Sequence, residues 1–225
     1  MWLCNSSIGR KVVMSVTGVA LILFLTFHMS MNIAALFSGE AYNMICEFLG
    51  ANWYALVATL GLAALAVIHI IYAFWLTMQN RKARGNERYA VTTRPAGVEW
   101  SSQNMLVLGI IIILGLLLHL FNFWYNMMFA ELTGITVAHD PADGYAYIVD
   151  TFACPVYVVL YIVWIVALWF HLTHGFWSAM QTFGWSGKTW FCRWKVIGIA
   201  YSTLLCLGFL VVVLWFAAKG LCGCC

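Results

Sequence analysis

Charged side chains are scarce in this chain of 225 residues, of which only 8% are Asp, Glu, Lys or Arg. Apolar residues make up 64% of the chain, and the mean hydropathy is +0.90. This composition excludes a soluble domain with an ordinary polar surface. It indicates an integral membrane protein in contact with lipid, and no nucleic acid is expected as a partner.

Five segments have no Asp, Glu, Lys or Arg away from their ends. Each is long enough to cross about 30 Å of hydrocarbon as a helix that rises about 1.5 Å per residue. We therefore predict an all-α membrane protein, a bundle of five transmembrane helices. The chain has no internal repeat or long linker, so residues 1–225 are expected to form a single domain. The predicted spans are 12–37, 53–78, 104–129, 152–180 and 195–218.

Lys and Arg are absent from the loops 38–52 and 130–151, which carry six acids, with Pro141 and Gly144 as turn formers in the second loop. Apart from Lys219, every Lys and Arg lies before the first span or in the other two loops. The positive-inside rule therefore places the N-terminus in the cytoplasm and the C-terminus outside. The run after Lys11 has no A-x-A cleavage pattern and is read as the first span, not as a secretory signal.

The eight cysteines do not form the regular spacing of a disulfide framework. Most are expected to be small apolar packing residues. The terminal cluster of Cys222, Cys224 and Cys225 could bind a metal or be modified, although a terminus without such a role is the favoured interpretation.

Four histidines lie within four different spans, and an ionisable residue in hydrocarbon indicates a functional site. From the predicted topology, His28 and His119 lie about 25 and 24 Å from the inner surface, in the outer half. His69 and His171 lie about 18 and 15 Å deep, in the inner half. Two imidazoles at each of two depths are what two bis-histidine b-type haems need, so we predict these residues as the axial ligands of the haem irons.

A haem edge also needs room beside its ligand. Ala73, Gly115 and Gly175 each lie one helical turn from a predicted ligand, on the same face. The corresponding position for His28 is Asn32, and its nearest glycine is Gly18.

Each histidine could instead simply hydrogen-bond a neighbouring helix, but matched depths for all four make this reading weak. His174 is a rival to His171, although it would lie about 4.5 Å nearer the cytoplasm. We expect it to contact a haem propionate or a helix end. His139, in the outer loop, is expected to be solvated.

Four stretches resemble the five-helix, two-haem cytochrome b subunit of succinate dehydrogenase and quinol:fumarate reductase, in the order found in that family. The resemblance covers essentially the whole chain. The stretches are SSIGRKVVMSVTGVALILFLTFHMSMN, VIHIIYAFWLTMQNRKARG, LLLHLFNFWYN and FHLTHGFWSAMQTFGW.

The resemblance implies that His69 and His171 ligate a proximal haem, near an iron–sulfur subunit, and that His28 and His119 ligate a distal one. It implies an anchor in the bacterial cytoplasmic membrane for that subunit and an FAD-containing flavoprotein, both on the cytoplasmic face. Electrons would pass between succinate or fumarate and a quinone, expected to be menaquinone. The whole complex could be a dimer, and the direction of electron flow is open.

Quinone chemistry also needs a protonatable group, for which Glu47 and Glu131 are candidates. Aromatic residues are expected at the membrane interfaces, where they could also contact the quinone ring. These are Trp53, Tyr54, Trp124 and Tyr125. Two other functions stay open: a cytochrome b of another enzyme, such as a nitrate reductase or hydrogenase, and a transporter or proton-conducting bundle without haem.

Overall fold

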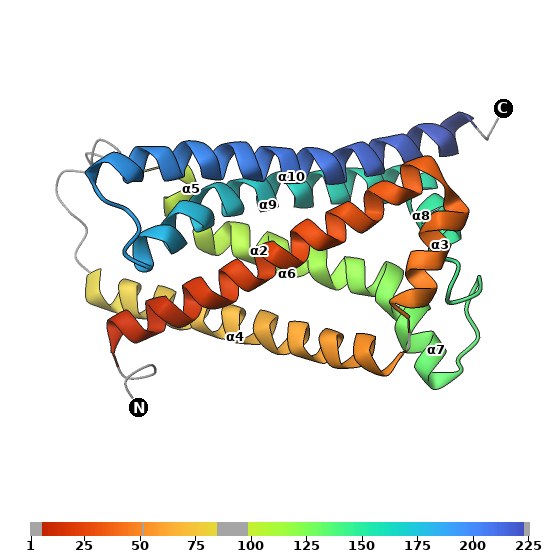
Figure 1. The fold of residues 1–225 in the computed structure, drawn as a ribbon, viewed down its shortest axis with the longest axis horizontal. Coiled ribbons are helices and arrows are strands. Elements are labelled where there is room, and N and C mark those ends of the chain that lie inside the picture. Colours follow the sequence, from red (N-terminus) through yellow and green to blue (C-terminus); the bar gives the residue numbers. More distant parts are fainter. Residues whose placement is uncertain (1–5, 51, 85–98, 223–225) are drawn as a thin grey trace.

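The computed structural model describes residues 6–50, 52–84 and 99–222, and every regular element in these ranges is helical. Five helices are long and apolar enough to cross a membrane (Figure 1), as the uncharged segments predict. Most of these five helices extend beyond the limits predicted for the spans. The five helices are α2 (Ser7–Phe37), α4 (Trp53–Arg84), the continuous run of α6 (Met105–His119), η1 (Leu120–Phe129) and α7 (Ala130–Thr133), α9 (Pro155–Thr182) and α10 (Lys188–Cys222).

The two acidic loops each contain a short helix that the sequence analysis did not predict, α3 (Gly39–Phe48) and α8 (Gly144–Ala153). Both helices begin after a capping side chain. Ser38 accepts a hydrogen bond from the backbone N–H of Ala41 at 3.2 Å, and Asp143 accepts one from Ala146 at 3.1 Å. Such caps satisfy N–H groups that have no partner within the helix. Gly144 is therefore the first residue of a helix and not a turn former.

The predicted fourth span begins too early. Residues 152 and 153 belong to α8, which ends at Ala153, and α9 starts at Pro155 after Cys154. Proline favours the first position of a helix because its fixed φ suits the helix and that position needs no N–H. Pro155 therefore separates the short helix from the long one.

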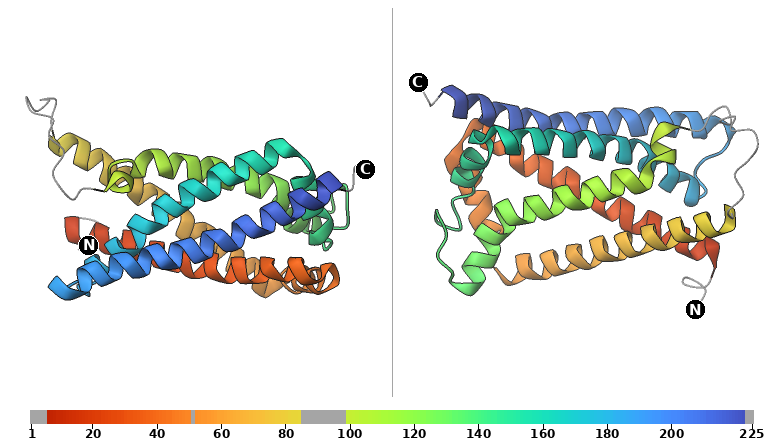
Figure 2. Two further views of the ribbon diagram at one scale, coloured as in Figure 1. Left: turned by 90° about the horizontal axis from the view of Figure 1, so that it is seen from above. Right: turned by 180° about the vertical axis from the view of Figure 1, so that it is seen from behind.

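Charge distinguishes the two ends of the bundle. The start of α2, the end of α4, α5 (Trp100–Gln103) and the connection from α9 to α10 lie together at one end (Figure 1). Helices α3, α7 and α8 and the end of α10 lie at the other end (Figure 2). The first, here called the basic end, carries Lys11, Arg81, Lys82, Lys188, Arg193 and Lys195. The second, the acidic end, carries Glu40, Glu47, Glu131, Asp140, Asp143 and Asp150.

Helix α9 is central to the packing. It lies against α10 along much of its length and also contacts α2 and α6. The most deeply buried large side chains include Phe216 and Leu205 of α10 and Ile148 of α8. Helix α4 packs mainly on α2 and touches α6 at few positions. The dense core therefore lies between α8, α9 and α10, and the side of the bundle at α4 is more loosely packed.

Glycine allows α6 and α9 to approach closely. A Cβ atom on Gly115 would lie 2.1 Å from Cδ1 of the Trp164 ring. The indole N–H of Trp164 donates to the carbonyl of Ile112 at 3.0 Å and so fixes the ring. The expectation that Gly115 leaves room for a haem edge is therefore wrong, because Trp164 occupies this space.

Gly115→Ala is expected to destabilise the protein by about 1–3 kcal/mol, since an added methyl group forces a rigid indole or the backbone to move. The heat-unfolding midpoint of the detergent-solubilised protein measures this change. Gly61→Ala is the matched control, because nothing lies within 4 Å of the position of its Cβ. Equal midpoints for the two variants would contradict the packing described for Gly115.

Candidate functional site

A large cavity of about 1370 Å³ lies between α2, α4, α6 and α9. Pockets for one drug-sized ligand have volumes of about 300–1,000 Å³, so this cavity can hold more than one such molecule. Most of its lining is aliphatic or aromatic. His28, His69, His119, His171 and His174 all line it.

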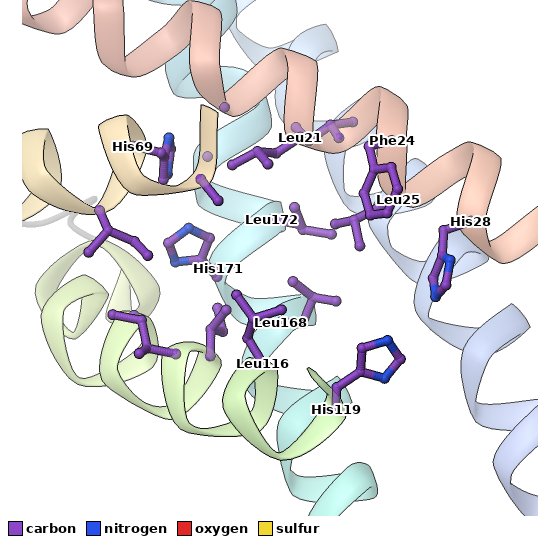
Figure 3. Close-up of a pocket in the computed structure, with 18 of the residues that line it drawn as sticks. Leu21, Phe24, Leu25, His28, His69, Leu116, His119, Leu168, His171 and Leu172 are labelled. Carbon is purple, nitrogen blue, oxygen red and sulfur yellow. The ribbon is translucent and has the colours of Figure 1, made fainter. Parts of the chain in front are cut away.

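The structure brings four of these histidines together as two pairs (Figure 3). The ring centres of His69 and His171 are 6.4 Å apart, and those of His28 and His119 are 5.7 Å apart. Each pair joins two helices, α4 with α9 and α2 with α6. These are the pairs that the depth estimate predicts. His174 instead has its ring against Trp177, at 5.0 Å between centres.

The two pairs lie at different levels of the bundle. Thr17 contacts the ring of His69, and His28 follows Thr17 by 11 residues, about 16 Å along α2. Leu25, Leu168 and Leu172 lie between the pairs (Figure 3). Apolar side chains therefore separate two polar levels within one cavity.

The two pairs have different surroundings. Around His28 and His119 the neighbours are aromatic: Phe24 stacks on His28 at 5.5 Å, and Trp164 lies 5.6 Å from His119 between ring centres. Asn32 also contacts His28, because its Nδ2 donates to the His28 carbonyl at 2.8 Å and lies 3.4 Å from Nε2 of the ring. Asn32 thus fills the position at which the other ligands have a small residue.

Haem is the group against which these pairs can be tested. A metal–imidazole bond is about 2.0 Å long. Two such bonds plus the radius of each ring place the centres of two imidazoles on one metal about 6 Å apart. The ring-centre distances in both histidine pairs are close to this value. The buried Nδ1 atoms of His119 and His171 have no hydrogen-bond partner among the described residues. Among those residues no cluster of three His, Cys, Asp or Glu could hold a bare metal ion. A porphyrin iron needs only two protein ligands, so the residues fit this group.

Clearance beside the predicted ligands differs from site to site. Nothing lies within 4 Å of the position that a Cβ on Gly175 would take, and Gly175 lines the cavity, as does Ala73. Gly18 lies next to His69 and not next to His28: a Cβ there would be 3.3 Å from Cε1 of His69. Open space therefore lies beside Gly175, one turn after His171, and Ala73, one turn after His69, also borders the cavity.

A charged cluster lies where the cavity reaches the basic end. Lys195 donates to Glu99 at 2.7 Å, the indole N–H of Trp177 donates to the same carboxylate at 3.3 Å, and Nδ1 of His174 is 3.9 Å away. That last separation is longer than a hydrogen bond. Burial raises the pKa of Glu99, but the hydrogen bond and the charge of Lys195 outweigh it, so this pKa lies below its ordinary value. Glu99 is therefore ionised at neutral pH.

The two candidate acids at the acidic end are placed differently. Glu131 lines the cavity together with Trp124, whereas Glu47 is not part of the lining. Near them, burial raises the pKa of Cys46 to about 11 and also raises that of its neighbour Tyr42, so both stay neutral at physiological pH. Among the described side chains that line the cavity at this end, Glu131 is the only carboxylate.

The remaining histidine and aromatic candidates lie outside the cavity or at its edge. His139 is a third exposed and lies 2.5 Å from Asp150, so it is paired as well as solvated. Trp53 is 79% exposed and Tyr125 is 40% exposed. The hydroxyl of Tyr54 donates to the Phe48 carbonyl at 2.5 Å. Cys224 and Cys225 lie outside the described residues, and the side chain of Cys222 is likewise not described.

The sequence analysis did not identify two features next to the histidine pairs, a π-helix and a buried threonine. The helix that carries His119 continues as a π-helix, η1, a form that is often found at functional sites. In it, the side-chain amide of Asn126 donates to the carbonyls of Phe121 and Asn122 at 3.0 Å. Thr17 is a buried polar residue three turns before His28, so helical spacing alone would have placed both on one face.

Comparison of the chain with protein-family models, with curated proteins and with solved structures found no match.

Proposed function

We propose that this chain is a dihaem cytochrome b that anchors a succinate:quinone oxidoreductase, either a succinate dehydrogenase or a fumarate reductase, in the bacterial cytoplasmic membrane. It would pass electrons between an iron–sulfur subunit and menaquinone or menaquinol, with no dicarboxylate site of its own. The observation that carries the proposal is the presence of two imidazole pairs at two levels of one apolar cavity. The link to succinate rests on the four resembling stretches alone.

Haem b held between two imidazoles supplies one-electron redox chemistry. His69 and His171 would hold the iron nearer the basic end, and His28 and His119 the iron nearer the acidic end. An iron held by two imidazoles in this way would have no site for oxygen and would serve in electron transfer. The mostly apolar lining would surround the haems with a low dielectric, which helps to set redox potentials.

The basic end is the proposed docking surface for the iron–sulfur protein and the FAD-containing flavoprotein. Its exposed cations include Lys11, Arg81, Lys82, Lys188 and Arg193. Complementary charge steers association and fixes the orientation of a partner. Docking here would bring an iron–sulfur cluster closest to the level of His69 and His171, with the N-terminus on the cytoplasmic side.

The acidic end is the proposed place of quinone turnover. Quinol oxidation releases protons and quinone reduction consumes them, so a protonatable group must reach the ring. Glu131 is the candidate because it lines the cavity, as does Trp124, whose indole offers a flat surface for a quinone ring. Glu47 lacks this access to the cavity.

A transporter without haem is less well supported by the same geometry. A proton relay needs polar groups in one continuous path, whereas leucine side chains separate the two histidine levels. The cytochrome b of a nitrate reductase or hydrogenase would use the same haem chemistry. The partner proteins that the chain binds distinguish that function from the proposed one.

The purified protein is expected to contain about two haems per chain in a pyridine haemochrome assay. His171→Ala and His69→Ala should each remove the haem nearer the basic end and leave the other. His174→Ala should retain both haems, because its ring lies against Trp177 and not against His69. His139→Ala is the control outside the cavity. Absence of haem from the parent protein would remove the proposal, and loss of a haem from His174→Ala would reverse the choice of ligand.

The partners are tested by gentle solubilisation and affinity purification of the tagged full-length chain from its native membrane. A flavoprotein with bound FAD and an iron–sulfur protein are expected to co-purify, and the complex should interconvert succinate and fumarate with a quinone. Recovery of the subunits of a nitrate reductase or hydrogenase instead would assign the chain to that other class.

Glu131→Gln is expected to slow quinone turnover by the purified complex about 100-fold or more, the usual range for removal of a group that transfers protons. Glu47→Gln is the matched control at the same end and should leave the rate close to that of the parent. Haem content should be unchanged in both variants. Equal rates for the two variants would contradict the role given to Glu131.

A further inference from the structure

Thr17 is a polar residue at a deeply buried position of an otherwise apolar helix. Only 4% of its surface is exposed, and it lies in α2 at the level of His69. Its hydroxyl oxygen is 2.9 Å from the carbonyl oxygen of Val13 and 3.1 Å from that of Met14. Because carbonyl oxygens only accept, the single hydroxyl proton can be donated to one of them.

The same hydroxyl oxygen lies 3.0 Å from Nδ1 of His69, across the α2 and α4 interface. Thr17 belongs to α2, so the Nδ1 edge of the imidazole faces this helix. Among the described residues no other side chain forms a hydrogen bond with this ring.

The available donors and acceptors favour one of the two neutral forms of the His69 ring. If Nδ1 carries the proton, it donates to Thr17, and the Thr17 hydroxyl donates to its own helix, so that both donors are satisfied. If Nε2 carries the proton, that donor has no side-chain acceptor among the described residues. An imidazole N–H without an acceptor is unfavourable. The Nδ1–H form is therefore favoured, with an unprotonated Nε2.

Gly18 allows this contact to form. A Cβ atom at Gly18 would lie 3.3 Å from Cε1 and 3.8 Å from Nδ1 of His69, so the glycine lets the Nδ1 edge of the ring lie against α2. His119 and His171 differ, because their Nδ1 atoms have no partner among the described residues. Of the four paired histidines, His69 is the one whose Nδ1 has a hydroxyl partner in the described part of the chain.

We propose that Thr17 is a positioning residue that holds His69 in its Nδ1–H form and so leaves Nε2 free to bind iron, an inference that rests on the proposed function. A hydrogen bond from Nδ1–H makes the opposite nitrogen a stronger electron donor. A stronger donor favours the ferric state, so Thr17 lowers the midpoint potential of the haem nearer the basic end.

The first test needs no haem. Nitrogen-15 NMR of the haem-free, histidine-labelled full chain in detergent reports which ring nitrogen carries the proton. The signal of His69 is assigned by its loss in His69→Gln. The Nδ1–H form is expected in the parent and in Thr17→Ser, and a mixture of both forms is expected in Thr17→Val, which keeps the shape but has no hydroxyl. An Nε2–H form in the parent, or an unchanged form in Thr17→Val, would overturn the inference.

The second test measures haem affinity and the midpoint potential of the haem that His171→Ala loses. Thr17→Val should bind this haem about 10–100-fold more weakly, as loss of such a supporting contact typically does, and should raise its potential. Thr17→Ser should restore both values. Thr133→Val is the matched control, since its hydroxyl also donates within its own helix but lies far from a histidine pair.

The outcomes of these tests separate the two proposals. If the parent binds no haem, the proposed function fails, and the NMR result alone decides whether Thr17 sets the form of His69. If the parent binds haem but Thr17→Val equals Thr17→Ser in affinity and potential, the positioning role is wrong while the proposed function stands.

Discussion

The structure depends on one constraint: an imidazole kept in hydrocarbon needs a partner for its nitrogens. This chain places four such rings in four different helices and brings them together in pairs across one cavity. Much of the helix arrangement follows from this. Helix α9 lies where it can reach both α4 through His171 and α6 through Trp164, and α2 contributes to both levels.

The dense core and the cavity lie in different parts of the bundle. Helices α8, α9 and α10 form a dense core, with Phe216, Leu205 and Ile148 almost fully buried. Helices α2, α4 and α6 surround a cavity in place of such a core, and α4 is held mainly by α2. A large ligand that filled the cavity would therefore also connect α4 to the rest of the bundle, so ligand binding and folding are expected to be coupled.

The sequence predicted those parts of the fold that follow from length, polarity and helical rise. Five spans and the pairing of His28 with His119 and His69 with His171 need only these quantities. It did not predict α3 and α8, because their capping residues Ser38 and Asp143 are common in loops as well. The predicted clearance beside Gly115 was wrong, because a side chain from another helix, Trp164, fills the space next to this glycine. The contact of Thr17 with His69 likewise joins residues far apart in the chain.

The most direct measurement of the central claim is an experimental density map of the protein purified from its native membrane at a resolution that separates side chains. The account predicts flat, porphyrin-sized density between His69 and His171, and again between His28 and His119, with the imidazoles approaching its centre from both faces. A map in which these four side chains meet only protein, lipid or water would contradict it.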